Sequence, residues 1–181
     1  MCDIQETELW DVYDADRIRT GRTVARGSAA ADAAGVYHMV IHVCIFNARD
    51  EMLIQQRQPF KRGWSNLWDV TVGGSAVGGD SSRAAAEREL FEELGLRMDF
   101  EHARPAFTIN FDNGFDDFYL AETEVDLLAL TLQYEEVQRV KWASKAEIFR
   151  MMESGEFIPY HTGLIEMCFA MRGQTGAIRQ G

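Results

Sequence analysis

The sequence predicts an α/β fold in which helices cover both faces of one β-sheet, an α/β/α sandwich. Strand-like runs are interleaved with helical patterns along the chain, an order that favours this architecture. The 181 residues are 46% apolar and 26% charged, which is typical of one compact domain with a sizeable core. No repeat, low-complexity tract or linker interrupts them, so we expect a single domain over residues 1–181.

Strands dominate the N-terminal part of the expected fold. Residues 5–14 partly alternate between polar and apolar side chains and predict an edge strand, followed by a polar turn around Asp16. The small residues at 27–35 predict a loop. The apolar, β-branched and aromatic run from Val36 to Asn47 predicts a buried strand.

A hairpin and a basic loop are expected next. After a turn at 48–51, residues 52–56 predict a second strand that pairs back on the first. Residues 58–67 are typical of a loop. The segment 68–72 predicts a short strand that runs directly into the glycine pair at 73–74.

A helix follows the glycine pair. Ser81 or Ser82 can cap its first turn, and Gly95 suits the position just past a helix end. The residues that form its apolar stripe are Ala86, Leu90 and Leu94, with Phe91 flanking. We expect this stripe to pack on the sheet, while the opposite, charged face looks into a cleft.

The remaining sequence predicts three strands and two helices. The strands are expected at 100–111, 115–121 and 136–142, and the helices at 144–153 and 160–172. The Asn113-Gly114 pair between the first two strands is a strong hairpin signal. Ser144 and Glu147 form a capping box, which predicts the start of the first of these helices.

Three carboxylates crowd the end of the helix after the glycine pair. Glu89, Glu92 and Glu93 lie at positions i, i+3 and i+4, so a helix would place them on one patch. Adjacent like charges weaken a helix by a few tenths of a kcal/mol per pair, unless a cation sits on them. Carboxylate oxygens on a rigid helix suit Mg²⁺ or Mn²⁺, which in turn recruit phosphate groups.

The same segment resembles the Nudix box, which reads G, five residues, E, seven residues, R-E-apolar-x-E-E-x-G-apolar. Gly74 is followed by five residues, Asp80, seven residues and then the run from Arg88 to Leu96. Every defined position of this box at 74–96 matches except Asp80, where the family has Glu. The resemblance implies an α/β/α sandwich of the Nudix type with a mixed sheet.

The resemblance also implies roles for these residues. In Nudix hydrolases the positions of Glu89, Glu92 and Glu93 ligate Mg²⁺ or Mn²⁺, and the backbone carbonyl at Gly74 adds a ligand. Glu89 is a candidate base for the attacking water. Arg88 is expected to orient a glutamate and to pair with the residue at Asp80, where the shorter Asp puts the pairing in question.

Substrate contacts are expected outside the box. Arg57, Lys61 and Arg62 are candidate phosphate contacts, with plain surface solvation as the alternative. A further carboxylate completes the site in several Nudix enzymes, and Asp116 or Asp117 is favoured over the other acidic candidates. Those other candidates are Asp112, Glu135 and Glu136, and the aromatic residues that could stack on a base, or simply pack, are Phe60, Trp64 and Trp68.

Composition limits the classes of molecule that this protein is expected to bind. The net charge of −11 argues against binding to a nucleic-acid backbone, but an acidic site can hold a small phosphorylated substrate through divalent ions. The chain contains no apolar run of 18 residues, so the sequence predicts no membrane-spanning helix. Its N-terminus lacks the features of a secretory signal, and we therefore expect a cytoplasmic protein. Cys2, Cys44 and Cys168 show no metal or disulfide spacing. A homodimer is plausible for this fold.

Residues 7–143 resemble the part of the family close to isopentenyl-diphosphate isomerase. That enzyme protonates a double bond with a Cys in the motif C-G-H-P, where this chain has Gly73 and Ser75 at the Cys and His positions. Glycine supplies neither a proton nor a thiolate. His38 matches a metal-binding histidine of the isomerase, and His42 faces the same side of the strand, which leaves this pair as a second candidate metal site.

The sequence therefore predicts Mg²⁺-dependent hydrolysis of a diphosphate linkage in a nucleoside diphosphate derivative. Two alternatives stay open. One is isomerase-like activity on a prenyl diphosphate. The other is a non-catalytic domain that senses a nucleotide, although such a domain usually has a damaged box or an added DNA-binding domain, and neither is expected here.

Overall fold

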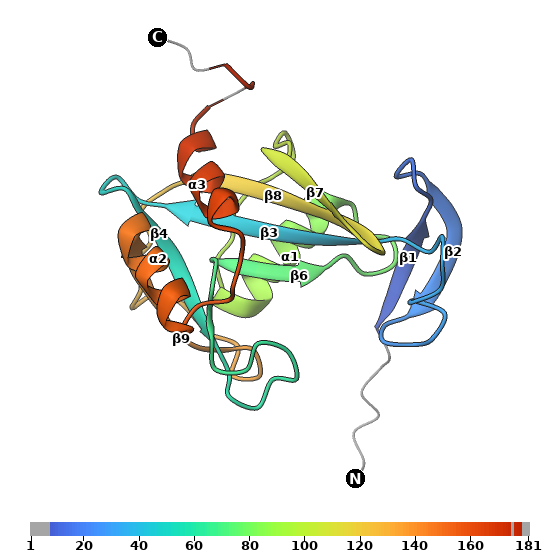
Figure 1. Cartoon of the computed structure of the whole chain (residues 1–181), viewed down its shortest axis with the longest axis horizontal. Coiled ribbons are helices and arrows are strands. Elements are labelled where there is room, and N and C mark those ends of the chain that lie inside the picture. The colour runs from blue at the N-terminus through green and yellow to red at the C-terminus, as the bar shows by residue number, and fades with distance from the viewer. Residues whose placement is uncertain (1–7, 175, 179–181) are drawn as a thin grey trace.

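A long central strand organises the sheet of this protein, whose computed structural model describes residues 8–174 and 176–178 (Figure 1). β3 (His38–Phe46) pairs in parallel with β8 (Gly114–Glu122) along its whole length. On its other side it pairs antiparallel with β6 (Val72–Ser75). The sheet is therefore mixed, as predicted.

The other strands extend the sheet at both edges. β7 (Phe107–Phe111) and β8 form the hairpin that the Asn-Gly pair predicts, closing at Phe111 opposite Gly114. On the opposite side, β4 (Glu51–Arg57) pairs antiparallel with β9 (Val137–Ser144) and with the two-residue strand β5 (Trp68–Asp69).

The sheet splits where the site will lie. β3 and β4 pair only at Phe46 and Met52, next to their connecting turn, and then diverge (Figure 1). The predicted hairpin is therefore confirmed only at its base. Beyond that point β6 continues the β3 side and β5 with β9 continue the β4 side. Side chains from both halves can meet in the gap.

Helices cover both faces, which confirms the α/β/α sandwich. α1 (Ser82–Leu94) packs Leu90 and Leu94 against the face of β3 that carries Val43. α2 (Lys145–Ser154) and α3 (Thr162–Met171) pack on the opposite face. Figure 1 shows α1 behind the sheet and the two C-terminal helices in front of it.

The ends of α1 agree with the sequence. The hydroxyl of Ser81 accepts a hydrogen bond from the backbone N–H of Ala84, which caps the first turn. Gly95 adopts a left-handed conformation with φ of 67°, which favours glycine, and its N–H bonds back to the last turn. Leu90 and Leu94 are fully buried, whereas Phe91 is exposed.

A separate two-stranded sheet lies at the N-terminal side. β1 (Leu9–Tyr13) pairs antiparallel with β2 (Arg19–Ala25), and not with the edge of the main sheet. The predicted strand at 5–14 begins in residues outside the described ranges. β2 was missed because its side chains are mostly polar and exposed, so no hydrophobic alternation marks it.

Two other strand boundaries were predicted wrongly. The expected strand at 68–72 is two strands, because the chain bends at 70–71 and changes its partner from β4 to β3. The expected strand at 100–111 begins only at Phe107. Phe100 is buried, but it packs edge-on against Tyr119 from an irregular segment, so its burial imitates a strand pattern.

The C-terminal helices form where the sequence places them. Ser144 caps α2 by accepting from the N–H of Glu147, while the Glu147 carboxylate pairs with Lys141 at 2.6 Å. Only the first half of the predicted capping box therefore forms. Among the residues that the structure describes, no helix has the length and apolar character needed to cross a membrane.

The burial of Leu90 gives a direct test of the α1 packing. Leu90→Ala should lower the free energy of unfolding by about 2–5 kcal/mol, since it leaves a cavity against the sheet. Leu128 is 96% exposed, so Leu128→Ala should change it by less than about 0.5 kcal/mol. Urea denaturation followed by circular dichroism measures both, and equal effects would contradict this packing.

Candidate active site

The three clustered glutamates of α1 differ sharply in their surroundings. Glu93 is only 4% exposed, and its carboxylate accepts a hydrogen bond of 2.8 Å from the amide of Gln55 on β4. The Glu89 side chain is 13% exposed, and that of Glu92 is 47% exposed. The charged face of the helix is therefore not fully separate from its apolar stripe, because Glu93 turns into the gap between β3 and β4.

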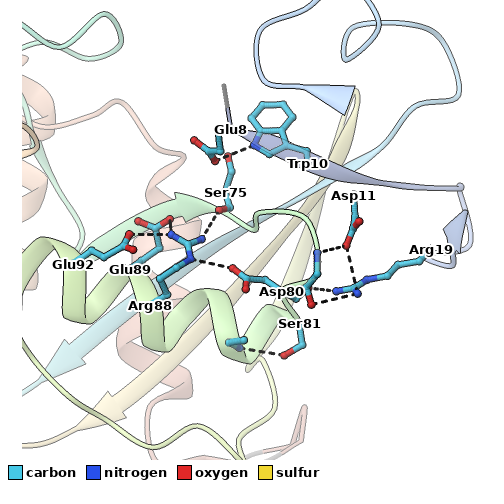
Figure 2. Close-up of polar contacts among 12 residues, drawn as sticks. Glu8, Trp10, Asp11, Arg19, Ser75, Asp80, Ser81, Arg88, Glu89 and Glu92 are labelled. Atoms are coloured by element: carbon cyan, nitrogen blue, oxygen red, sulfur yellow. Dashed lines mark hydrogen bonds and ion pairs between the residues drawn. The ribbon is translucent and has the colours of Figure 1, made fainter. Parts of the chain in front are cut away.

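Arg88 holds four acceptors at once (Figure 2). Its Nε donates to Asp80 at 3.0 Å, and its Nη1 donates to Glu89 at 2.9 Å and to Glu92 at 3.0 Å. Its Nη2 donates to the backbone carbonyl of Ser75 at 3.0 Å. The shorter Asp80 thus reaches Arg88, so the pairing that the substitution of Asp for Glu had put in question is present.

The loop that carries Asp80 is tied to the N-terminal hairpin. The guanidinium of Arg19, on β2, donates to the backbone carbonyl of Asp80 and pairs with Asp11 at 3.4 Å. Asp11 in turn accepts from the N–H of Gly79 at 2.9 Å. Figure 2 shows these contacts on the side of Asp80 opposite to Arg88. The small sheet therefore helps to fix the loop that positions Arg88.

Burial and mutual repulsion disfavour the ionised forms of Glu89 and Glu93. Burial raises the pKa of Glu93 well above its ordinary value, and the nearby charge of Glu89 raises it further. Burial also raises the pKa of Glu89, although Arg88 opposes the shift. The carboxylate of Glu8, just before β1, adds to the rise. A cation placed between such groups would favour their ionised forms.

Gly73 and Gly74 leave the middle of β6 without side chains on either face. A Cβ built on Gly74 would overlap the carboxylate of Glu89. A Cβ on Gly73 would lie 2.7 Å from the ring of His42, on the other face of the strand. Any larger residue at these positions would therefore displace Glu89 or His42, and the bare backbone of Gly74 stays open beside the Glu89 carboxylate.

The carboxylates of Glu89, Glu92 and Glu93 are of a type that binds divalent ions, but their oxygens do not converge on one point. Within residues 8–174 and 176–178, no group of three histidine, cysteine, aspartate or glutamate side chains is placed to hold a metal. Arg88 engages Glu89 and Glu92, and Gln55 engages Glu93. The donor chemistry and the raised pKa values fit a hard cation, whereas the predicted three-glutamate cluster is not assembled.

The two candidate carboxylates of β8 point to opposite faces of the sheet. Asp117 is fully buried, and its oxygens are taken by Arg17 at 2.7 Å, Ser82 at 2.6 Å and Thr108 at 2.6 Å. These bonds tie β8 to the start of α1. Asp116 is partly exposed and pairs with His42 at 2.7 Å. The structure therefore gives Asp117 a supporting place and leaves Asp116 bonded to His42 on the other face of the sheet.

The basic and aromatic candidates are also divided. Arg57 lines a cavity, with its Nη1 3.7 Å from Asp69, whereas Lys61 pairs with Glu136 and Arg62 lies exposed on the loop. Trp68 is buried in the core and covered by cationic side chains. Trp64 on the same loop is 54% exposed.

A cavity of about 380 Å³ lies beside β6 and includes residues that the sequence did not reveal. His42 and Gly74 line it together with Asp69 and Tyr160. The two latter side chains are 91 residues apart and carry no motif, so only the fold brings them together. His38 has other partners, since its ring stacks on Trp10 at 4.0 Å, and this does not support the alternative of a His38–His42 metal pair.

Known proteins resemble this chain in sequence. The model of the NUDIX domain family matches residues 36–161. An uncharacterised Nudix hydrolase of Listeria monocytogenes is 46% identical over 153 residues, which cover 84% of this chain and 89% of that protein. An isopentenyl-diphosphate Delta-isomerase of Pectobacterium atrosepticum is 38% identical over 88 residues, covering 46% of this chain and 48% of that protein.

Solved structures share the fold. DR0079 from Deinococcus radiodurans superposes with a TM-score of 0.72 at 20% identity, covering 89% of this chain and 99% of that one. The NUDIX domain of Shewanella oneidensis NrtR, in complex with ADP-ribose, superposes with a TM-score of 0.57 at 20% identity, covering 78% and 90%. The sheet and helix arrangement described above is common to them.

The raised pKa of Glu93 predicts that the free energy of unfolding depends on pH when a chelator keeps the protein free of metal. The folded state favours the protonated acid, so its contribution is full below the unfolded value of about 4.3 and is lost as the pH rises through the folded pKa. Glu93→Gln cannot ionise and should therefore gain stability relative to the wild type as the pH rises above the unfolded value. Guanidinium denaturation at several pH values measures this difference.

The matched control is Glu153→Gln, an exposed change at the end of α2. Its unfolding free energy relative to the wild type should stay flat over the same pH range, because the side chain is solvated in both states. A flat profile for Glu93→Gln as well would show that Glu93 is not held in a site that disfavours its charge.

Proposed function

Since this chain belongs to the Nudix family and is a hydrolase acting on pyrophosphate bonds, we propose that it cleaves the diphosphate linkage of a nucleoside diphosphate derivative with Mg²⁺ or Mn²⁺. The observation that carries this proposal is a pair of carboxylates withdrawn from solvent, the buried Glu93 and the largely covered Glu89, of which Glu89 lies beside the bare backbone of Gly74. Their raised pKa values are an unfavourable condition that a divalent cation would relieve.

Each residue of the site has a proposed task. Glu89, Glu92 and Glu93 and the carbonyl of Gly74 would hold the ion, with Arg88 released from the outer glutamates but still anchored on Asp80 and on the Ser75 carbonyl. When bound, the ion supplies neutralisation of the phosphate oxygens and makes water a better nucleophile. The proposed base for that water is Glu89, whose carboxylate lies beside the backbone of Gly74.

The nucleotide part of the proposal has two supports. The structurally similar NrtR domain was solved with ADP-ribose, a molecule that carries a diphosphate between two sugars. In this chain, Arg57 at the cavity and the exposed Trp64 on the following loop offer a phosphate contact and a stacking surface. Lys61 and Arg62 lie on the same loop, and the Lys61–Glu136 pair would have to open for Lys61 to contact phosphate.

The isomerase alternative is disfavoured by Gly73. This residue occupies the position at which the isomerase has its acid-base cysteine, and the His42 ring fills the space in which a side chain would lie. The sensing alternative is disfavoured by the intact support of Arg88, which contacts Glu89 and Glu92 and is itself held by Asp80 and the Ser75 carbonyl. Cytoplasmic location and assembly into a homodimer stay predictions from the sequence.

The central test is Glu93→Gln. It should lower kcat/KM by more than about 100-fold while the protein stays folded, because even outer-shell partners of a metal cost up to this factor. Glu153→Gln serves as the control and should retain full activity. Release of phosphate or of a nucleoside monophosphate is followed with Mg²⁺ and with Mn²⁺.

The substrate panel for this test contains nucleoside diphosphates, nucleotide sugars and prenyl diphosphates. Hydrolysis confined to the nucleotides supports the proposal. Isomerisation of a prenyl diphosphate without hydrolysis would replace it by the isomerase, and tight nucleotide binding without turnover would replace it by a sensor. Unchanged turnover in Glu93→Gln would exclude the proposed role of the glutamates.

The contact between Gly74 and Glu89 predicts a second effect. Gly74→Ala should displace the Glu89 carboxylate, weaken Mn²⁺ binding and lower kcat/KM by about tenfold or more, since small displacements of catalytic groups are costly. Gly163→Ala is the matched control, because nothing lies within 4 Å of its Cβ position. Calorimetric titration with Mn²⁺ measures the affinity, and equal affinity in both variants would contradict the role of Gly74.

A further inference from the structure

A buried amide oxygen lies beside the glutamates of α1 without a hydrogen-bond partner. It belongs to Gln55, whose side chain extends from β4 and which is only 2% exposed. The amide nitrogen of Gln55 donates to Oε2 of Glu93 at 2.8 Å. Within the part of the chain that the structure describes, Oε1 of Gln55 receives no hydrogen bond. One half of this amide is therefore used, and the other half is not.

An unpartnered acceptor of this kind is uncommon in a folded protein. Most buried polar atoms are hydrogen-bonded, and one that is left without a partner destabilises the fold. An apolar side chain suits the same surroundings, because Leu53 lies on the same face of β4 and is buried in the core under α1. A glutamine at position 55 therefore needs a reason other than packing.

The surroundings of Gln55 offer acceptors rather than donors. The charges that raise the pKa of Glu93 come from Glu89, Glu136 and Asp69, and ionised carboxylates only accept hydrogen bonds. Although β4 is flanked by β5 and β9 at this point, no main-chain N–H of the described residues reaches Oε1. A donor must therefore come from a molecule that binds here, and the carboxylates favour one that brings positive charge.

A divalent ion with part of its water shell meets both requirements. Mg²⁺ usually keeps several of its waters when protein carboxylates bind it, and a water molecule can donate a hydrogen bond. The oxygen and nitrogen of one amide lie about 2.3 Å apart, so the unpartnered oxygen of Gln55 is also beside Glu93. Glu93 is the most deeply buried of the proposed ligands, and a water on its ion would find an acceptor in Gln55.

We propose that Gln55 is a positioning residue for the metal centre, which holds Glu93 through its amide nitrogen and a water of the divalent ion through its amide oxygen. This inference rests on the ion of the proposed function. It adds a residue of β4, outside the box motif, to the groups that organise that ion. Gln55 contacts no reacting atom, so its effect on the reaction passes through Glu93 and the water.

The neighbouring Gln56 provides a matched control. It is also buried, at 6% exposed, but it points to the other face of β4, and both ends of its amide have partners. Its nitrogen donates to the carbonyl of Asn66 at 2.8 Å, and its oxygen accepts from Arg139 at 2.6 Å. The two glutamines therefore differ in the respect that the test uses, an unpartnered oxygen beside the proposed ligands.

The test compares Gln55→Met with Gln56→Met, since methionine is a flexible side chain that supplies no hydrogen-bond donor and only a weak acceptor. Calorimetric titration with Mn²⁺, without any substrate, measures the affinity. Gln55→Met should weaken Mn²⁺ binding by about tenfold or more, as is typical of a lost partner of a metal ligand. Gln56→Met should keep the wild-type affinity.

Circular dichroism verifies that these variants are folded. Two further variants repeat the comparison if either one is not. Gln55→Leu matches the apolar surroundings of the neighbouring Leu53, and Gln138→Met changes an exposed glutamine of β9. The expected result is the same, with weaker Mn²⁺ binding only where Gln55 is replaced.

A second measurement separates the two ends of the Gln55 amide. Oxygen-17 relaxation at saturating Mn²⁺ gives the residence time of water on the bound ion. In Gln55→Met this residence time should shorten by about twofold or more, because the held water loses its acceptor. An unchanged residence time with weakened Mn²⁺ affinity would mean that Gln55 acts on Glu93 alone, and it would overturn the inference.

Both measurements are made without a substrate, so their outcome is separate from that of the proposed hydrolysis. A wild type that hydrolyses no compound of the panel, but whose Mn²⁺ affinity and water exchange depend on Gln55, would overturn the proposed function and keep the role of Gln55. Hydrolysis by the wild type with unchanged Mn²⁺ affinity in Gln55→Met would do the reverse. Equal losses in Gln55→Met and Gln56→Met would also overturn the inference.

Discussion

The desolvation of two carboxylates at the split in the sheet is the constraint on which the site depends. Glu89 and Glu93 are held in a place that raises their pKa values, and each is retained there by a neighbour with little freedom. Gln55 on β4 fixes Glu93 and Arg88 fixes Glu89. The unfavourable charge is tolerated because the large apolar core under α1 supplies the stability.

The fold creates this place through strand divergence. β3 and β4 share only one residue pair, so the sheet opens where Glu93 enters from one face and Asp69 from β5 at the edge. β6 lies in this opening with no side chains at 73–74, and it separates the carboxylates from the cavity of His42 and Tyr160. The same strand therefore borders both the carboxylates and the cavity.

Local patterns predicted most of the framework and the placement of the box residues on and before α1. The box motif, the serine cap and the Asn-Gly turn act over a few residues, so they could be located from sequence, as could the burial of Leu90. The strand β2 and the Tyr160–Asp69 contact could not, because exposed polar strands lack periodicity and distant pairings depend on how the sheet splits. The arrangement of Glu89 and Glu92 on Arg88 also could not be predicted, because it depends on competing side-chain partners.

The closeness of Gly73 to the His42 ring restricts how the chemistry of this fold could change through substitutions. A cysteine at 73 would place its Cβ 2.7 Å from the His42 ring, and removal of that ring would break the contacts to Asp116 and Tyr160. A lineage moving between hydrolysis and double-bond protonation therefore needs the ring at position 42 to shift or to be replaced when a cysteine arrives at position 73. The effect of a cysteine at position 73 thus depends on the residue at position 42, which is epistasis between two facing residues.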